Sequence, residues 1–278
     1  MQVLSTVREM RAACRAARQQ GSLGLVPTMG ALHAGHISLV RAARAQCDGV
    51  AASIFVNPTQ FGPNEDFARY PRTFEQDCAL LDAEGVMLVF APRPEEMYPP
   101  GATTFVEVEG IGDRLDGASR PGHFRGVATI VAKLFHTVAP DKAFFGQKDA
   151  AQVAVLRRMV RDFNFDLELI VCPIVREPDG LALSSRNRYL SERERAQALV
   201  LSRALNAICA TYHAGQKQVA PLLDAGRSIM AIEPEVRIDY LEIVDPGTLL
   251  PLTEATPGAL VAIAAQVGST RLIDNAIL

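Results

Sequence analysis

A ten-residue stretch near the N-terminus, PTMGALHAGH at residues 27–36, most constrains how this chain can fold. The apolar run at residues 23–26 predicts a strand before it, and the amphipathic run at residues 37–47 predicts a helix after it. A strand, a glycine-bearing turn and a helix together present backbone N–H groups to an anion at the positive end of the helix. The stretch therefore predicts an anion site at the carboxyl end of a strand.

The side chains of this stretch favour a polyphosphate as the anion. Gly30 and Gly35 let the backbone approach a ligand where a Cβ would obstruct it. If the helix begins near His33, then His33 and His36 present their rings on one face as neutral or cationic donors. The plainer interpretation is a polar loop whose histidines only cap the helix. Two histidines at this spacing alone do not decide between the two.

Predicted strands and helices alternate through the first two thirds of the chain, as in an α/β fold with a mostly parallel sheet and helices on both faces. The polar loops that follow residues 26, 56 and 145 should converge on one edge of that sheet, where such folds bind ligands. The predicted helices are residues 3–18, 37–47, 73–84, 127–138 and 150–163, and the predicted strands are 23–26, 50–56, 86–90, 103–108, 142–145 and 167–171.

The pattern changes near residue 177, where helices are followed by strands. A capping box at Ser191 and Glu194 predicts a long helix to about residue 213, and a shorter helix follows at 221–232. Strands are predicted at 236–244, 259–266 and 270–276. We therefore expect two domains, residues 1–176 and a smaller α+β domain at residues 177–278.

Composition narrows the class of protein. The 278 residues are 49% hydrophobic, so a sizeable core is available, and the net charge of −3 argues against a broad nucleic-acid footprint. We find no apolar run long enough to span a bilayer and no signal-peptide core. The five cysteines are scattered without a C-x-x-C pair, which favours a reducing cytoplasm and makes metal binding by cysteine a poor interpretation.

Three further segments carry side chains suited to phosphate or to a small polar substrate. Lys148 lies between a predicted strand and helix, where its ammonium can reach a β- or γ-phosphate. Residues 183–186, LSSR, combine hydroxyls with a guanidinium that can hold a triphosphate. Taken singly, Lys148 is also consistent with an exposed lysine at a helix start, and residues 183–186 are consistent with an ordinary turn. Gln152 forms the pattern of a capping box with Asp149, and the cationic loop at 110–126 is typical of a solvated surface.

Taken together, the motifs resemble a known family. HAGH at residues 33–36 resembles the His-x-Gly-His signature of the nucleotidyltransferase superfamily, which includes class I aminoacyl-tRNA synthetases. The longer PTMGALHAGH, with FFGQKD at residues 144–149, closely resembles the pantoate–β-alanine ligases. LSSR resembles the KMSKS-type second signature, with Leu183 where the family commonly has methionine. The resemblance covers residues 23–189.

The resemblance implies a Rossmann-like nucleotidyltransferase domain, with the KMSKS-like loop at the start of the C-terminal domain. It implies ATP as substrate, Mg²⁺ held mainly by phosphate oxygens without assigned protein ligands, a cytoplasmic homodimer, and no nucleic-acid or membrane partner. It implies His36, His33 and Lys148 as catalytic residues, and Gln60, Gln152 and Arg120 as residues that bind pantoate or β-alanine. The residues that it implies for ATP binding are Met29, Gly30, Ala31, Leu32, His33, Ala34, Gly35, His36, Gly146, Gln147, Lys148, Asp149, Val175, Leu183, Ser184, Ser185 and Arg186.

The implied reaction is the ATP-dependent condensation of (R)-pantoate with β-alanine, which gives pantothenate, AMP and diphosphate through pantoyl adenylate.

Asp77 is a weaker candidate as a carboxylate near Mg²⁺, and an acid on a helix surface is its plainer interpretation. The alternatives are another adenylyl- or cytidylyltransferase, a module that senses ATP without turnover, and a truncated relative of a tRNA synthetase, which the charge balance disfavours.

Overall fold

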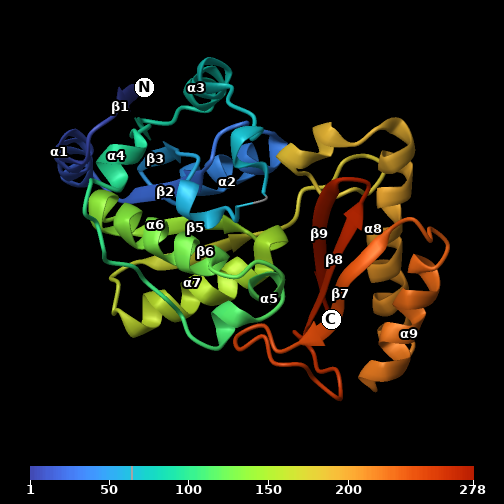
Figure 1. Cartoon of the computed structure of the whole chain (residues 1–278). Helices are drawn as coiled ribbons and strands as arrows, with labels where there is room; N and C mark the ends of the chain where they lie inside the picture. The colour runs from blue at the N-terminus through green and yellow to red at the C-terminus, as the bar shows by residue number, and fades with distance from the viewer. Residues whose placement is uncertain (64) are drawn as a thin grey trace.

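The computed structural model describes residues 1–63 and 65–278, and within them the chain forms one six-stranded and one three-stranded sheet (Figure 1). Asn64, the last residue of the loop predicted at 57–64, lies outside the described residues. The larger sheet is wholly parallel, in the order β1-β4-β3-β2-β5-β6. Its strands are β1 (Gln2–Leu4), β2 (Leu23–Thr28), β3 (Gly49–Ile54), β4 (Leu88–Phe90), β5 (Lys142–Gly146) and β6 (Glu168–Cys172).

Helices cover both faces of this sheet, as the alternating pattern predicts. On one face, α1 (Val7–Arg18), α6 (His123–Val138) and α7 (Ala150–Asp162) form a core with the side chains of Leu23 and Leu25. On the other face, α2 (Ala34–Arg44) and α3 (Phe74–Ala83) pack over Val26. The strand order reverses between β2 and β5, so the loops after these two strands open at the switch point where open α/β sheets bind ligands.

The smaller sheet is antiparallel and lies beside the larger one. Its strands are β7 (Arg237–Val244), β8 (Leu260–Val267) and β9 (Thr270–Ile277). The long helix α8 (Glu192–His213) and α9 (Val219–Met230) pack on the face directed away from the larger sheet (Figure 1). Ser191 and Glu194 form the predicted capping box at the start of α8. The predicted fold class, a parallel Rossmann-like sheet with a smaller α+β unit, is confirmed.

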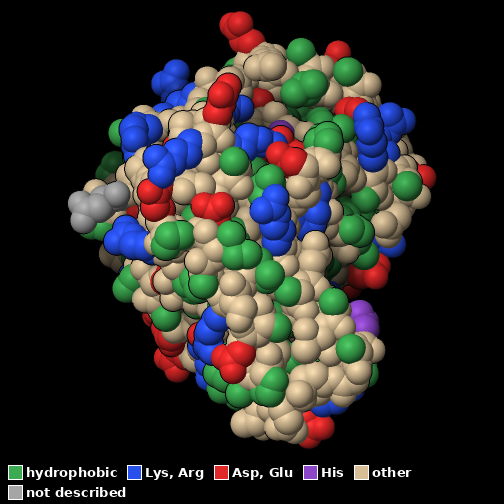
Figure 2. Space-filling view, turned by 90° about the vertical axis from the view of Figure 1, so that its right-hand side faces the viewer, with side chains coloured by type: hydrophobic (Ala, Val, Ile, Leu, Met, Phe, Trp, Pro, Cys, Tyr) green, Lys and Arg blue, Asp and Glu red, His purple; other side chains and the backbone are tan. Residues whose placement is uncertain are grey.

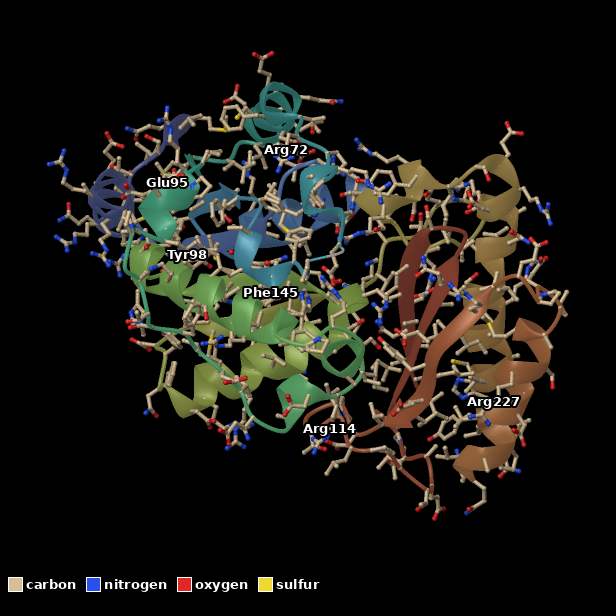
Figure 3. The ribbon with its side chains drawn as sticks, in the orientation of Figure 1. Arg72, Glu95, Tyr98, Arg114, Phe145 and Arg227 are labelled. Atoms are coloured by element: carbon tan, nitrogen blue, oxygen red, sulfur yellow. The ribbon has the colours of Figure 1, made fainter. Side chains whose placement is uncertain are left out.

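Short helical segments make up much of the loops around the site. They are η1 (Pro58–Gln60), η2 (Asp66–Ala68), α4 (Pro94–Met97), η3 (Ile111–Asp113), α5 (Asp116–Ser119), η4 (Gln147–Asp149) and η5 (Ser185–Tyr189). The segment at 110–126, predicted as a solvated loop, therefore contains η3, α5 and the start of α6. Arg114 in this segment donates to the Thr248 carbonyl across to the second sheet, and Figure 3 shows it near that junction.

Two predicted elements differ from the structure. The helix predicted from residue 3 begins at Val7, because Thr6 caps it through a capping box with Glu9, and residues 2–4 instead pair with β4. The segment at 103–108 is not assigned as a strand, since none of the described strands lies beside it to complete a ladder. Its alternating pattern nonetheless leaves Phe105 exposed.

The surface carries charges of both signs. On the face shown in Figure 2, Lys and Arg side chains are interspersed with Asp and Glu side chains. In the part of the chain that the structure describes, no helix combines the length and apolar character needed to cross a bilayer.

Candidate active site

Two cavities meet between the carboxyl ends of β2, β3 and β5 and the second sheet. The larger has a volume of about 680 Å³, and the smaller has a volume of about 160 Å³. Both are lined by seven residues from four separate segments, namely Met29, His36, Tyr70, Lys148, Asp149, Ser184 and Arg186. The three loops that the sequence predicts to converge all line the larger cavity, through Met29, Gln60 and Lys148.

A buried carboxylate fixes the turn after β2. Gly30 and Ala31 both have positive φ, +84° and +50°, so the N–H groups of Ala31 and Leu32 point the same way. Asp77 of α3 accepts both, at 2.9 Å from Ala31 and 2.8 Å from Leu32, and it is only 1% exposed. Two donors predicted to face a phosphate therefore bind a carboxylate of the chain itself. Asp77 is not the surface acid of the plainer interpretation.

The two histidines of the stretch have assigned tautomers. His33 accepts the Gly35 N–H at Nδ1, 3.1 Å away, and His36 accepts the His33 N–H at Nδ1, 3.3 Å away. A neutral imidazole that accepts at Nδ1 carries its proton on Nε2. Their ring centroids lie 4.1 Å apart, and both rings line the smaller cavity. Each histidine thus takes part in capping the helix through Nδ1, as the plainer interpretation has it, and the proton on Nε2 stays available to a ligand.

Both imidazoles are neutral near physiological pH. Burial, with a contribution from the Lys148 ammonium, lowers the pKa of His33 to about 4. Burial and the neighbouring His33 lower the pKa of His36 to about 3. The Nε2–H groups are therefore neutral donors, and the cationic charge at the junction of the cavities comes from Lys148 and Arg186.

Lys148 lies in the turn between β5 and α7 and borders both cavities. Its ammonium is 3.6 Å from the Asp149 carboxylate, a loose ion pair that leaves the cation available to a ligand. Asp149 makes no side-chain cap at the start of α7, so the capping box suggested by its spacing to Gln152 does not form. Gln152 instead lines the larger cavity.

The KMSKS-like segment, residues 183–186, contacts the stretch at residues 27–36. The Ser185 hydroxyl donates to the Ala31 carbonyl at 3.1 Å, and the Ser184 hydroxyl accepts the Arg186 N–H at 3.2 Å. The Arg186 guanidinium donates from Nε and Nη2 to Asp66, at 2.9 and 2.8 Å. Burial opposes the charge on Asp66, but the guanidinium outweighs this and lowers the pKa of that carboxyl. The residues predicted to hold phosphate thus lie together, with Arg186 paired to an acid.

Gln60, the other predicted glutamine, also lines the larger cavity. Gln60 donates from Nε2 to the Met29 sulfur at 2.9 Å and accepts at Oε1 from Asn57 at 3.1 Å. Asn57 is 1% exposed and also donates to the Gly126 carbonyl, while its Oδ1 accepts from Tyr98 at 2.8 Å. Asn57 therefore orients Gln60, a role that the sequence motifs did not indicate.

Gly126 permits this arrangement. A Cβ at that position would lie 2.3 Å from the Thr59 carbonyl oxygen, so only glycine lets α6 approach the turn that carries Gln60.

Arg120 lines the same cavity but is held by other residues. Its guanidinium forms two hydrogen bonds with Glu65, at 2.7 and 2.6 Å, and one with His123 Nε2 at 2.9 Å. His123 Nδ1 in turn lies 2.9 Å from the Gln60 carbonyl oxygen. Burial and Arg120 lower the pKa of His123 to about 4, consistent with a neutral ring that donates to the carbonyl and accepts from the guanidinium. Arg120 therefore braces the wall that carries Gln60.

Most of the predicted nucleotide residues line the smaller cavity, but five line neither cavity. Those that line it are Met29, His33, Gly35, His36, Gly146, Lys148, Asp149, Val175, Leu183, Ser184, Ser185 and Arg186. Those that do not are Gly30, Ala31, Leu32, Ala34 and Gln147. Gln60, Gln152 and Arg120 all line the larger cavity and not the smaller one. Among the described residues, no group of three His, Cys, Asp or Glu side chains could hold a metal ion.

Comparison with known proteins agrees with this geometry. The model of the family described as pantoate-beta-alanine ligase matches residues 2–277. The chain belongs to the pantoate–β-alanine ligase family. The pantothenate synthetases of Acidobacterium capsulatum and Koribacter versatilis are each 64% identical to it, over 100% of this chain and 97% and 96% of their own.

Solved structures of pantoate–β-alanine ligases have the same fold. Pantothenate synthetase from Thermus thermophilus matches with a TM-score of 0.95 at 53% identity, over 99% of each chain. The ligase from Francisella tularensis, solved with β-γ ATP and β-alanine, matches with a TM-score of 0.81 at 33% identity, over 100% of this chain and 97% of its own. The resemblance that the motifs carried is confirmed along the whole chain.

Proposed function

We propose that this pantoate–β-alanine ligase joins (R)-pantoate to β-alanine through a pantoyl-adenylate intermediate, with ATP in the smaller cavity and pantoate in the larger. The observation that carries the assignment is the position of Lys148 and His36, which border both cavities. The α-phosphate of a nucleotide seated at this junction would meet a carboxylate arriving from the amide-lined side. Membership of the family and the ligase relatives support the reaction.

In the first step the pantoate carboxylate attacks the α-phosphate in line and diphosphate leaves. A carboxylate is ionised near neutral pH, so this step needs orientation and charge stabilisation instead of a general base. The Nε2–H groups of His33 and His36 are neutral donors, and Lys148 supplies a positive charge. Such donors stabilise the charge that grows on the phosphate oxygens. Ser184, Ser185 and Arg186 hold the β- and γ-phosphates of ATP.

ATP is taken as its Mg²⁺ complex. The residues present fit a cation that is bound by the nucleotide. Asp77, the buried acid of α3 beside the turn after β2, already accepts two backbone N–H groups, so its carboxylate is not free to bind a metal. Phosphate oxygens and water would supply the oxygen ligands that this ion favours in nucleotide sites.

In the second step the β-alanine amine attacks the acyl carbon of the adenylate, an amide bond forms and AMP leaves. The larger cavity has the volume for both organic substrates, and Gln60 and Gln152 offer neutral, directional hydrogen bonds to the pantoate hydroxyls and carboxylate. Once diphosphate has left and the adenylate has formed, the amides keep the acyl group in place for the amine.

An isotope-exchange assay tests the two-step order. With pantoate present and β-alanine absent, the enzyme should exchange labelled diphosphate into ATP. Omission of pantoate is the control and should abolish exchange. Exchange that strictly required β-alanine would contradict the adenylate intermediate, while the family assignment would still stand.

The proposal includes a cytoplasmic homodimer. All five cysteines carry free thiols, which suits a reducing compartment. The extended segment at 103–108 runs along the outside of α6 (Figure 1). Its Phe105 side chain is 40% exposed. No backbone–backbone hydrogen bond joins residues 103–107 to another described residue. Such an edge can pair with its copy about a two-fold axis. A Phe105→Lys variant should sediment as a monomer, and Phe163→Lys, at another exposed phenylalanine, should not.

A further inference from the structure

The last strand of the second sheet reaches into the nucleotide site through one side chain. Asn275 of β9 is 3% exposed, and its Nδ2 donates to the carbonyl oxygens of Gln147 at 2.9 Å and Lys148 at 3.0 Å. Its Oδ1 accepts from the Gln147 side-chain amide at 3.0 Å. The three side-chain hydrogen bonds of Asn275 therefore all go to η4, the turn that carries Lys148.

Asn275 is itself rigidly held. Its backbone N–H donates to the Asp274 carboxylate at 2.8 Å, and Asp274 forms two hydrogen bonds with Arg176, at 2.6 and 2.9 Å. Residue 275 also pairs with Ala262 in the register of β8 and β9. The Asn275 side-chain amide is thus held in place by the second sheet. Its two N–H groups fix the carbonyls of Gln147 and Lys148 relative to that sheet.

The carbonyls that Asn275 holds lie on either side of the Lys148 Cα. Fixing the carbonyl before a residue and the carbonyl after it restricts the rotation of its backbone and hence the direction in which its side chain leaves. The ammonium of Lys148 ends at the boundary of the two cavities with only a 3.6 Å contact to Asp149. The hydrogen bonds from Asn275 therefore restrain the backbone from which this side chain leaves.

We propose that Asn275 is a positioning residue for adenylation, which acts by aiming Lys148 at the transferring phosphate. The inference rests on the role proposed above for Lys148. It gives the second sheet a part in the first chemical step, although the motifs for that step, apart from the KMSKS-like segment, all precede residue 150.

The test is a double-mutant cycle on pantoate-dependent ATP–diphosphate exchange, with the full chain. Asn275→Ala should lower the exchange kcat by roughly tenfold to a hundredfold, the loss expected when a catalytic group is displaced by about 1 Å. The KM for pantoate should change less than about threefold, because the amide pocket is untouched. In a Lys148→Ala background, Asn275→Ala should cause no further loss, since the group that it aims is gone.

The control is Asp239→Asn. Asp239 of β7 also links the second sheet to the part of the chain that carries the larger sheet. It accepts a hydrogen bond from the Ser119 hydroxyl of α5 at 2.9 Å and makes none with η4 among the described residues. Its exchange rate should stay near that of the unmodified enzyme. Asn275→Asp keeps the side-chain volume and turns a carboxylate toward the two carbonyls, so it serves where the alanine variant folds poorly, and it should lose at least as much rate.

The outcomes are separable. A Lys148→Ala enzyme with normal exchange would overturn the proposed role of Lys148 and this inference with it. If Lys148→Ala is impaired but Asn275→Ala lowers the rate by the same factor in both backgrounds, only the inference fails, because Asn275 then acts independently of Lys148. Normal exchange by Asn275→Ala would have the same meaning.

Discussion

The Asp77 carboxylate accepts the backbone N–H of Leu32 at 2.8 Å, across 45 residues of sequence, and so ties α3 to the turn after β2. The second oxygen of Asp77 takes the neighbouring Ala31 N–H, and the Thr73 hydroxyl donates to the carboxylate at 3.1 Å. The Thr73 side chain makes no capping hydrogen bond at the start of α3, because this hydroxyl donates to Asp77. The shape of the turn therefore depends on a distant acid.

Replacing Asp77 with Asn should destabilise the enzyme. The amide NH₂ would face one of the two backbone N–H groups, which leaves a buried donor without its acceptor. An unsatisfied buried group costs about 1–3 kcal/mol. Urea unfolding measures this loss, and Glu75→Gln, at an exposed acid of the same helix, is the control. Equal midpoints for the two variants would contradict the role given to Asp77.

Removal of Lys148 or His36 should slow adenylation while the fold is kept. Each interacts with charge that grows as diphosphate leaves, and loss of one such donor lowers kcat by on the order of a hundredfold or more. Single-turnover formation of adenylate measures the step directly. Lys142→Ala, at the start of β5, the strand that precedes Lys148, should retain its rate. A folded Lys148→Ala or His36→Ala enzyme with near-normal turnover would remove that residue from the mechanism.

The two glutamines should govern pantoate and not ATP. Gln60→Ala and Gln152→Ala should raise the KM for pantoate, since a hydrogen bond to a charged group contributes roughly 1.5–3 kcal/mol. ATP binding, measured by calorimetry, should stay nearly unchanged, because both amides line only the larger cavity. Gln152→Glu places a negative charge beside the pantoate carboxylate. Normal pantoate binding by that variant would assign Gln152 to the helix start alone.

Stability should fall as the solution is acidified from pH 7 to pH 5. The pKa values of His33, His36 and His123 lie at about 4, 3 and 4 in the folded chain, below the ordinary 6.5. Between these values and 6.5 the unfolded chain binds protons that the folded chain does not, so acid favours unfolding. The slope is at most about 1.4 kcal/mol per pH unit for each histidine.

Urea titrations at pH 7, 6 and 5 measure this slope. His123→Asn should make it shallower by up to one histidine's share, and His213→Asn, at the exposed end of α8, is the control. A slope that is unchanged in His123→Asn would show that His123 is not buried as a neutral ring.

The fold was largely predictable from the sequence because its signals are local. Apolar runs such as residues 50–56 and the capping box at Ser191 depend on neighbours in the chain, and they predicted β3 and the start of α8. The segment at 103–108 has the local pattern of a strand, but a ladder needs a partner, and periodicity does not report one. The two-domain division at residue 177 remains a prediction.

The site was predictable as far as its motifs reach. The motifs located the loops that line the smaller cavity, whereas Asn57, Asp77 and Asn275 were not assigned their roles. Each is a polar side chain with at least one partner among backbone groups or amides far away in sequence, at separations of up to 128 residues. Such contacts have no spacing rule, so only the folded chain reveals them.

The ion pair between Arg186 and Asp66 has a thermodynamic consequence. The same Nε and Nη2 protons cannot serve both Asp66 and a phosphate, so ATP bound as proposed would compete with Asp66 for one guanidinium. Competition of this kind is reciprocal: by whatever factor ATP loosens the segment that carries Asp66, a ligand that draws that segment away tightens ATP binding. With ATP bound as proposed, occupancy of one cavity would thus change affinity in the other through Arg186, which lines both.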